Sequence, residues 1–357
     1  MPGSNTTLGT MEMTSQTLSY LSPSQRKPQV SIVIVAWNGR DYLRHCLQLA
    51  AGDSPDVSRE IIVIDNGSTD GAPEMVASDF PDVHLVKTGE NLGFAGGNNR
   101  GFGLARAETV LLLNPDAFLE TPGTIARLLR HLEAYPGTGA VGCRLTYPDG
   151  RHQVGDGGHA PRPAAVLVHA LGLGRLVPGA RGLFLSPRRG TAPRQVDWLS
   201  GALILVRADV IRQVGGLDAG FFMYAEDVEW GCRMRRAGWQ VAYLPDLCAV
   251  HVQGGTQEAA DISTTWLDAL GRLYLQENPR GLALFRIAYG AGFSLRSAAY
   301  GVAGVLRRDP RLRRKAGIMR RYATHVLTMR RPDPSPSAAR SLPIASSNPE
   351  EHGVSHG

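Results

Sequence analysis

Cysteine is scarce in this sequence, which has four cysteines in 357 residues and no CxxC pair. That spacing indicates neither a zinc site nor a disulfide framework, and it favours a reducing compartment such as the cytoplasm. No uninterrupted apolar run is long enough to span a bilayer. The first residues also lack the basic start and apolar core of a signal peptide. We therefore expect a cytoplasmic protein without a membrane-spanning segment.

The glycine-rich stretch at residues 91–101 lacks two phosphate-binding signatures. It contains neither GxGxxG, the dinucleotide-binding fingerprint, nor GxxxxGK[ST], the P-loop. The net charge of +6 nevertheless indicates acidic partners, such as phosphorylated substrates, an anionic membrane surface or nucleic acid. No aromatic stacking motif or known nucleic-acid-binding module accompanies this charge, so we expect no nucleic-acid partner.

Short apolar runs alternate with helical patterns over the first third of the chain. Val30–Ala36, Ile61–Ile64 and Thr109–Leu113 are typical of strands buried on both faces. The alternation predicts an α/β fold with a mostly parallel, Rossmann-like sheet and helices on both faces. Polar residues follow these strands, and open α/β sheets bind ligands outside the carboxyl ends of their strands.

The pattern is less regular from about Gly137 to Arg194, which we interpret as Gly-, Pro- and Arg-rich loops. Regular elements return with predicted strands at 202–206 and 241–244 and a predicted helix at 226–237.

Composition also predicts the domain organisation. Both ends of the chain are rich in Ser, Thr or Pro, and we expect them to be disordered. The predicted parts are a disordered segment at 1–28, an α/β domain at 29–258, a helical basic extension at 259–331 and a disordered tail at 332–357.

A glycine-rich stretch, NLGFAGGNNRG, occupies residues 91–101. Alone, it is best interpreted as a flexible loop between a strand and the next helix. Its position between Asp65 and Asn114, which both follow predicted strands, favours a loop that lines a ligand cleft. The candidate nucleotide-binding residues in it are Asn91, Gly93 and Asn99.

Asn114, Pro115 and Asp116 follow the apolar run Leu111–Leu113. A single Asp after a strand is often a turn former or a helix cap, and proline favours a turn. A carboxylate beside a second oxygen ligand is also the least that a protein supplies to Mg²⁺ or Mn²⁺, because diphosphate oxygens and water can fill the other positions. The triplet alone is compatible with both roles.

Two adjacent carboxylates, Glu226 and Asp227, follow the aromatic stretch Phe221–Tyr224. Acidic residues at a helix start interact favourably with the helix dipole, which could also account for Glu229. Burial behind large apolar residues, together with mutual repulsion, would raise a carboxyl pKa towards that of a useful general base. This pair is our candidate for the catalytic base.

Three further residues have weaker signals. His251 ends a short apolar stretch, and it is a candidate metal ligand only if Asp116 binds a cation nearby. Trp198 and Gly201 precede the predicted strand at 202–206 and are candidates for a loop that contacts the donor or acceptor. A tryptophan at the start of a strand more often simply packs.

The order of these motifs, over about residues 30–256, resembles the inverting glycosyltransferases of family 2, which have the GT-A fold. In that family an aromatic-Asn pair beside the nucleobase ends the first strand, here Trp37 and Asn38. An acid after the second strand, here Asp65, hydrogen-bonds the pyrimidine. A DxD motif holds the metal and the diphosphate, and this chain has Asn114 at its first position and Asp116 at its third. The resemblance thus implies a GT-A type sheet. Its metal-binding motif has one negative charge fewer than DxD, because Asn114 replaces the first acid.

The same resemblance implies a mechanism and a substrate class. Asp227 corresponds to the catalytic base, and His251 to a further ligand of Mg²⁺ or Mn²⁺. The motifs NPDA, GGxD and FMYxEDVE look most like those of bacterial rhamnosyltransferases that extend polyprenyl-diphosphate-linked sugars. The implied reaction moves rhamnose from dTDP-rhamnose to a lipid-linked or glycan acceptor in cell-envelope polysaccharide synthesis.

Three alternatives stay open at this point. The donor could be a UDP-hexose or UDP-galactofuranose, because donor choice depends on loops that the motifs do not place. A nucleotidyltransferase would need a basic residue in its first glycine-rich loop, for which only Arg40 is available. Asn114 in place of an acid is also compatible with a catalytically silent scaffold of the same fold.

The extension at 259–331 is strongly basic. Between Arg280 and Arg331 there are thirteen Lys or Arg residues and one acid, Asp309. Residues 281–306 are apolar between their arginines, which predicts an interfacial helix at the inner face of the cell membrane, followed by a polybasic segment. The alternative is an amphipathic helix packed on the domain. The apolar side of the helix would consist of Leu282, Phe285, Tyr289 and Phe293.

Overall fold

The computed structural model describes residues 27–173, 182–185, 191–221, 225–252 and 264–331. The predicted disordered ends at 1–28 and 332–357 therefore lie almost entirely outside the described residues. The predicted domain boundary at 258 and the aromatic residues 222–224 also lie outside them.

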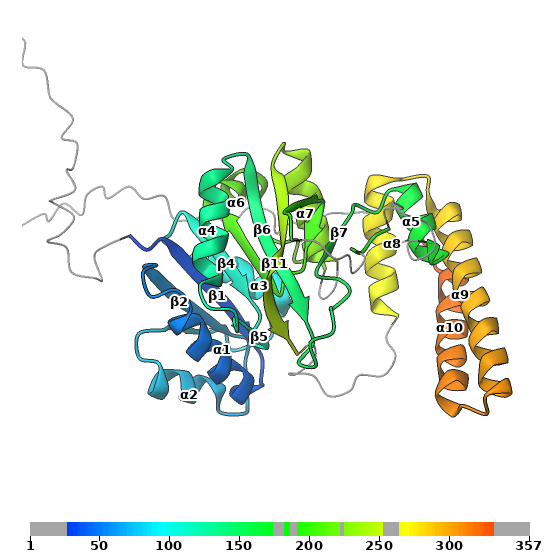
Figure 1. Cartoon of the computed structure of the whole chain (residues 1–357), viewed down its shortest axis with the longest axis horizontal. Coiled ribbons are helices and arrows are strands. Elements are labelled where there is room, and N and C mark those ends of the chain that lie inside the picture. The colour runs from blue at the N-terminus through cyan, green and yellow to red at the C-terminus, as the bar shows by residue number, and fades with distance from the viewer. Residues whose placement is uncertain (1–26, 174–181, 186–190, 222–224, 253–263, 332–357) are drawn as a thin grey trace, which may run out of the picture.

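A nine-stranded sheet forms the centre of the described chain (Figure 1). Its order is β3-β2-β1-β4-β10-β6-β11-β5, and β8 pairs with β11. Only β5, β8 and β10 run against the other six strands, so the predicted mostly parallel sheet is confirmed. A second, two-stranded sheet pairs β7 with β9. The strands are β1 (Val30–Ala36), β2 (Arg59–Asp65), β3 (His84–Lys87), β4 (Thr109–Leu113), β5 (Ala117–Phe118), β6 (Thr138–Thr146), β7 (Gly157–Gly158), β8 (Arg194–Val196), β9 (Trp198–Leu199), β10 (Leu203–Arg207) and β11 (Gln240–His251).

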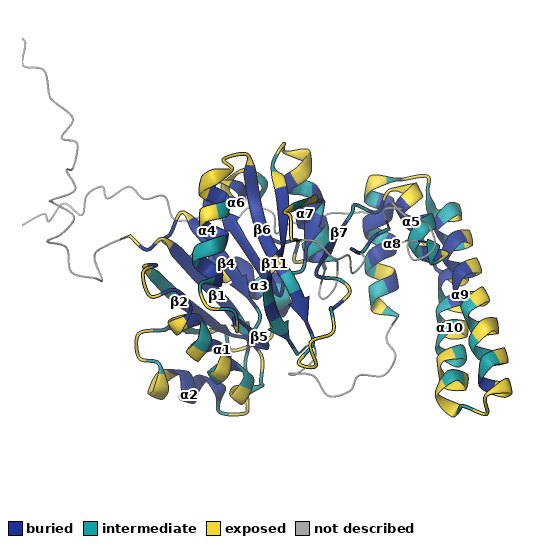
Figure 2. Ribbon diagram, viewed as in Figure 1, coloured by how far each residue is buried: buried dark blue, intermediate teal, exposed yellow. Residues whose placement is uncertain are grey.

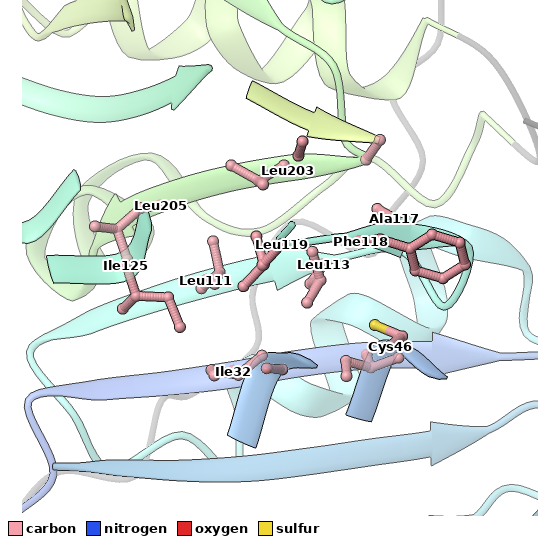
Figure 3. Packing of buried hydrophobic residues seen from close by; sticks show 14 of the residues in the cluster. Ile32, Cys46, Leu111, Leu113, Ala117, Phe118, Leu119, Ile125, Leu203 and Leu205 are labelled. Atoms are coloured by element: carbon pink, nitrogen blue, oxygen red, sulfur yellow. The ribbon is translucent and has the colours of Figure 1, made fainter. Parts of the chain in front are cut away.

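Helices pack on both faces of this sheet, as predicted. One face is covered by α1 (Arg40–Gly52), α2 (Ala72–Asp79) and α4 (Thr124–Ala134), and the other by α3 (Gly93–Phe102), α6 (Ala208–Val214) and α7 (Glu226–Arg236). Alternate residues of β1 show the division, since Ile32 and Ile34 enter the first core and Val33 the second. In the first core, Leu111 and Leu113 of β4 lie beside their partners on β10 (Figure 3).

The glycine-rich stretch is not a loop, which corrects the sequence interpretation. Residues 93–102 form α3, packed directly on β1. Gly97 and Gly101 are four residues apart and share the face that meets the strand. A Cβ atom at Gly97 would lie 2.6 Å from Val35 Cγ1, and one at Gly101 would lie 2.3 Å from Val33 Cγ1. Glycine is therefore needed here for close packing and not for flexibility.

This packing predicts a steric effect on stability. Gly101→Ala should destabilise the fold by about 1–3 kcal/mol, because the added methyl group overpacks the contact with Val33. Adding Val33→Ala should recover part of that loss, so the two costs should not add in urea unfolding. Gly103→Ala is the matched control, since its nearest neighbour, the Arg100 carbonyl oxygen, would lie 3.5 Å away. Additive costs in the double variant would contradict the proposed contact.

The segment at 137–194 also differs from the sequence interpretation, because it contains β6, β7 and α5 (Pro163–Ala170). β6 is an interior strand between β10 and β11. The strand was not predicted because its glycines are typical of loops. A Cβ atom at Gly139 would lie 2.8 Å from Val210 Cγ2, and one at Gly142 would lie 3.0 Å from the Leu203 carbonyl oxygen. These close approaches require glycine inside a strand.

The C-terminal helices are α8 (Thr265–Glu277), α9 (Leu282–Leu306) and α10 (Pro310–Thr328). Together with α5 they form a third hydrophobic core beside the α/β part (Figure 1). Phe285, Tyr289 and Phe293 are buried in it and Leu282 packs against it, so the prediction that this side of α9 faces a membrane is wrong. Arg296 connects α9 to the end of α5, because its guanidinium donates hydrogen bonds to the carbonyl groups of His169 (3.0 Å) and Ala170 (2.7 Å). Within the described residues no helix combines the length and hydropathy needed to cross a bilayer.

Candidate active site

One edge of the sheet collects most of the predicted site residues. The register of β1 on β2 aligns Ala36 with Asp65, so these parallel strands end together. β11 ends at the same edge, where His251 pairs with Ala117 of β5. β10 is antiparallel to β4, so it is the start of β10 that lies there. Open α/β sheets bind their ligands at this place, outside the carboxyl ends of the parallel strands.

The loops after β1 and β2 form the first part of the site. Asn38 has a left-handed backbone (φ 59°), and its N–H donates to Ser68 Oγ at 2.8 Å while its Oδ1 accepts from the Thr69 N–H at 2.9 Å. The buried Asp65 carboxylate accepts from the Ser68 N–H at 3.2 Å. Next to Asn38 in the chain, Trp37 is 42% exposed. An exposed indole beside fixed loops is suited to stacking on a planar base.

The predicted nucleotide-binding residues around α3 have two different environments. Asn91 Oδ1 accepts from the Gly93 N–H at 2.9 Å, and Asn66 Nδ2 donates to the Gly93 carbonyl at 3.1 Å, so the start of α3 is fixed beside β2. Asn99 is buried, and its amide exchanges two 2.8 Å hydrogen bonds with the backbone of Leu217. We therefore attribute Asn99 to the packing of α3 on the turn at residues 215–218, the GGxD motif, which corrects the expectation that it binds a nucleotide.

Asn114 and Asp116 meet His251 after β4, although His251 lies 137 positions from Asn114 in sequence. His251 Nε2 lies 3.2 Å from Asp116 Oδ1 and 3.4 Å from Asn114 Nδ2. Backbone bonds hold the group: the Asn114 N–H donates to the Ala202 carbonyl at 3.0 Å, and the Val252 N–H to the Asp116 carbonyl at 3.0 Å. Asp116 and His251 are both buried.

This group fits a divalent cation. His251 Nδ1 lies 2.8 Å from Gln153 Oε1, and a ring that donates there from Nδ1 would leave the Nε2 lone pair for a cation beside Asp116. Two electron-pair donors converging at 3.2 Å match adjacent positions of an octahedral Mg²⁺ or Mn²⁺ ion, whose ligands are roughly 3.0 Å apart. Turning the Asn114 amide would add an oxygen. Among the described residues no three His, Cys, Asp or Glu side chains cluster for a metal, so other ligands would have to complete the shell.

The two adjacent carboxylates lie at the start of α7, near this group. Asp227 Oδ2 accepts from the Gly201 N–H at 3.0 Å, and Asp227 Oδ1 accepts from the Val228 N–H at 2.8 Å. Gly201 is followed by Ala202, whose carbonyl accepts from the Asn114 N–H. Two consecutive residues thus connect Asp227 to the group formed by Asn114, Asp116 and His251. Ala225, at the helix N-cap, has a left-handed backbone (φ 69°), a strained conformation that is often found at functional sites.

Glu226 and Asp227 differ in how their charges are stabilised. Burial, and then the charge of Asp227, raise the pKa of Glu226 from 4.5 to about 8, and Glu226 Oε2 has no hydrogen-bond partner among the described residues. Burial also raises the pKa of Asp227, but the N–H groups of Gly201 and Val228 oppose that rise. In this pair we therefore assign the proton to Glu226 and the negative charge to Asp227 at neutral pH.

The raised pKa of Glu226 predicts a pH-dependent stability. Between pH 4.5 and about 8 the folded state keeps a proton that the unfolded state has lost, so the free energy of unfolding should fall as pH rises. The slope should be at most about 1.4 kcal/mol per pH unit and should vanish above the folded pKa. Glu226→Gln should remove this contribution, as urea unfolding of both proteins between about pH 5 and pH 8 would show. Parallel stability profiles would contradict the assignment.

Three other predicted residues have structural roles that the structure makes clear. Trp198 is buried and donates from Nε1 to the His159 carbonyl at 3.2 Å, so it packs. Glu229 is buried in an ion pair with Arg233 (2.6 Å), on the same helix. Gly201 gives room to an aromatic ring, because a Cβ atom there would lie 2.7 Å from Phe94 Cζ.

Two residues at the site were missed by the sequence interpretation. Phe94 lies beside Gly201, and therefore close to Asp227. Gln153 orients His251 and is itself held by its N–H, which donates to the Leu145 carbonyl at 2.9 Å. Phe94 lies within the glycine-rich stretch at 91–101 but was not among its candidate residues, and no signal in the sequence marks Gln153.

Comparison with known proteins agrees with this architecture. Residues 31–177 match the family model described as glycosyl transferase family 2. The chain is 32% identical over 216 residues to an N-acetylglucosaminyl-diphospho-decaprenol L-rhamnosyltransferase of Mycobacterium tuberculosis, an alignment that covers 54% of this chain and 66% of the relative. It is 26% identical to the low-salt glycan biosynthesis hexosyltransferase Agl10 of Haloferax volcanii, covering 73% of this chain and 79% of that protein.

A solved structure shows the same fold. The mannosyltransferase PcManGT of Pyrobaculum calidifontis, in complex with GDP-Man and Mn²⁺, superposes with a TM-score of 0.52 and 17% identity. The superposition covers 86% of this chain and 88% of that one. The expected GT-A type sheet is thus confirmed, and residues 31–177 form a domain of glycosyl transferase family 2.

Proposed function

We propose that this protein transfers a sugar from a nucleoside-diphosphate donor to a lipid-linked acceptor, with inversion at the anomeric carbon. The observation that carries the proposal is the convergence of Asp116 and His251 with Asp227 at one edge of the sheet. Asp116 and His251 can hold a cation beside a diphosphate, and Asp227 can accept a proton.

We infer the substrates from the relatives. The Mycobacterium tuberculosis relative is named for L-rhamnose transfer to a decaprenol-linked sugar. The motifs of this chain resemble the same group, so we propose dTDP-rhamnose as the donor and a polyprenyl-diphosphate-linked glycan as the acceptor. The product would enter cell-envelope polysaccharide synthesis. A UDP-sugar donor is the main alternative.

The nucleotide would lie across the loops after β1 and β2. Trp37 would stack on the base, and Asn38 and Asp65 would contact it at its edge. Asn91 and Gly93, at the start of α3, would line the next part of the cleft. Asp116, His251 and the Asn114 amide would hold Mg²⁺ or Mn²⁺, which when bound would neutralise the charge of the leaving diphosphate.

Asp227 would perform the proton transfer. Its carboxylate would take the proton of an acceptor hydroxyl as that oxygen bonds to the anomeric carbon and the bond from that carbon to the diphosphate breaks. Attack from the face opposite the leaving group inverts the configuration. The N–H donors of Gly201 and Val228 keep the carboxylate in one orientation, and neutral Glu226 avoids a second buried charge beside it.

We assign this reaction to residues 29–258 and contact with the inner face of the cell membrane to residues 259–331. A thermal-shift screen of dTDP- and UDP-sugars, with and without Mg²⁺ or Mn²⁺, tests the donor, because a bound ligand raises the melting temperature. We expect the largest shift with dTDP-rhamnose and metal together. A larger shift with a UDP-sugar would change the donor, and no shift with any nucleotide sugar would favour a silent scaffold.

A further inference from the structure

The side of α9 that faces away from α5 and α8 is apolar and exposed. Ile287 is 65% exposed, Leu295 66%, Val302 61% and Val305 67%. The spacing of these residues by three or four positions, or their multiples, puts them on one side of the helix. We call the set the outer stripe, and it consists of Ile287, Ala291, Leu295, Ala298, Val302 and Val305.

The outer stripe is long and carries no charge. It extends over about 27 Å at 1.5 Å per residue. Its residues lie roughly opposite Tyr289 and Arg296, which both hydrogen-bond to His169 of α5. Figure 2 shows α9 and α10 as mostly exposed or intermediate, and the buried residues of α9 lie mainly in its first half, beside α5 and α8. A surface helix of a globular protein normally shows polar residues on this side, so the stripe requires another explanation.

An arginine row on α10 flanks the outer stripe. Arg313 and Arg320 are exposed, and they lie about half a turn around α10 from Tyr322, whose ring contacts Trp266 of α8 with a centroid distance of 5.6 Å. Arg313 also lies against the end of α9, because a Cβ atom at Gly304 would be 2.9 Å from its Cγ. The row thus occupies the same outer side of the α9–α10 pair as the stripe.

Charge around the row has one sign. α10 contains no Asp or Glu, and Asp309 is the only acid between Leu282 and Arg331. Arg314 and Arg321 continue the exposed basic surface next to the row. A flat apolar strip bordered by guanidinium groups is complementary to a surface that is apolar inside and negatively charged outside.

We propose that the outer stripe and the arginine row dock the protein on an anionic phospholipid bilayer. The stripe lies at the boundary of the acyl chains, and Arg313 and Arg320 contact lipid phosphates. The contact face is therefore the opposite side of α9 from the one that the sequence pattern predicted. The proposal extends the proposed function, since a polyprenyl-linked acceptor lies in a membrane, but its test requires no sugar transfer.

Co-sedimentation of the full chain with vesicles tests this surface. Vesicles of phosphatidylcholine mixed equally with phosphatidylglycerol should bind the protein, and phosphatidylcholine alone should bind it much less. Leu295→Gln with Val302→Gln should lower the partition at least about ten-fold. Circular dichroism should be unchanged, because both positions are exposed.

The charge is tested with matched pairs. Arg313→Gln with Arg320→Gln should remove most of the salt-sensitive binding, whereas Lys87→Gln with Arg130→Gln, which removes the same charge from the α/β part, should not. Equal binding of the stripe variant and the unaltered protein would overturn the proposal. Self-association abolished by the stripe variant, without vesicle binding, would assign the stripe to a second copy and would also overturn it. Transfer to a water-soluble acceptor, if unchanged in all variants, separates this surface from the reaction.

Discussion

Asp227→Asn should lower turnover by about 10²- to 10⁴-fold while the affinity for the nucleotide-sugar donor changes little. The amide keeps the size of the side chain and can still accept a hydrogen bond from the Gly201 N–H, which lies 3.0 Å from the carboxylate. It cannot accept the proton of the acceptor hydroxyl. The loss should therefore appear in kcat, measured as sugar transfer at saturating donor, and not in donor binding.

Glu226→Gln is the matched control for that substitution. Burial raises the pKa of Glu226 to about 8, so this side chain is already neutral at neutral pH and the amide resembles its protonated form. Turnover should stay within a few-fold of the unaltered protein. If Glu226→Gln were as damaging as Asp227→Asn, or if Asp227→Asn turned over normally, the assignment of the base would be wrong.

Asp116→Asn should weaken Mn²⁺ binding more than any other single change at the site. The carboxylate faces His251 Nε2 at 3.2 Å and is the only anionic side chain assigned to the cation among the described residues. The loss should exceed the roughly 10- to 100-fold effect of removing an outer partner of a metal ligand. Paramagnetic resonance titration of Mn²⁺ in the presence of a nucleoside diphosphate measures it directly.

Asp209→Asn provides the comparison, because it removes the same charge from an exposed ion pair with Arg212 on α6. Its Mn²⁺ affinity should equal that of the unaltered protein. Equal affinities of Asp116→Asn and the unaltered protein would place the cation elsewhere. A partial loss in His251→Ala would show that the imidazole contributes as a second ligand.

The parts of the fold that were predicted correctly are those whose signal is local. Val30–Ala36 forms a strand because β-branched residues buried on both faces favour one, and the helix at 226–236 follows from its own apolar spacing. Asp65, Asn114 and Asp116 could be placed at one edge because parallel strands end together.

The errors come from residues whose role is set by distant partners. Glycines such as Gly101 and Gly142 are typical of loops when considered in isolation. In the fold they belong to a helix and a strand, and glycine is needed there because Val33 and Leu203 lie too close for a side chain. Gln153 orients His251 from 98 positions away in sequence, and this contact exists only in the folded chain. The exposed side of α9 could not be distinguished from its buried side, because both are apolar.

Sugar transfer itself tests the central claim most directly. The protein would be incubated with dTDP-L-rhamnose, Mg²⁺ or Mn²⁺, and polyprenyl-diphosphate-linked N-acetylglucosamine, and the product linkage would be determined by nuclear magnetic resonance. We predict one added rhamnose whose anomeric configuration is inverted relative to the donor, and no product from Asp227→Asn. Retention of configuration, or no transfer from any dTDP- or UDP-sugar under conditions where the protein is folded, would contradict the account.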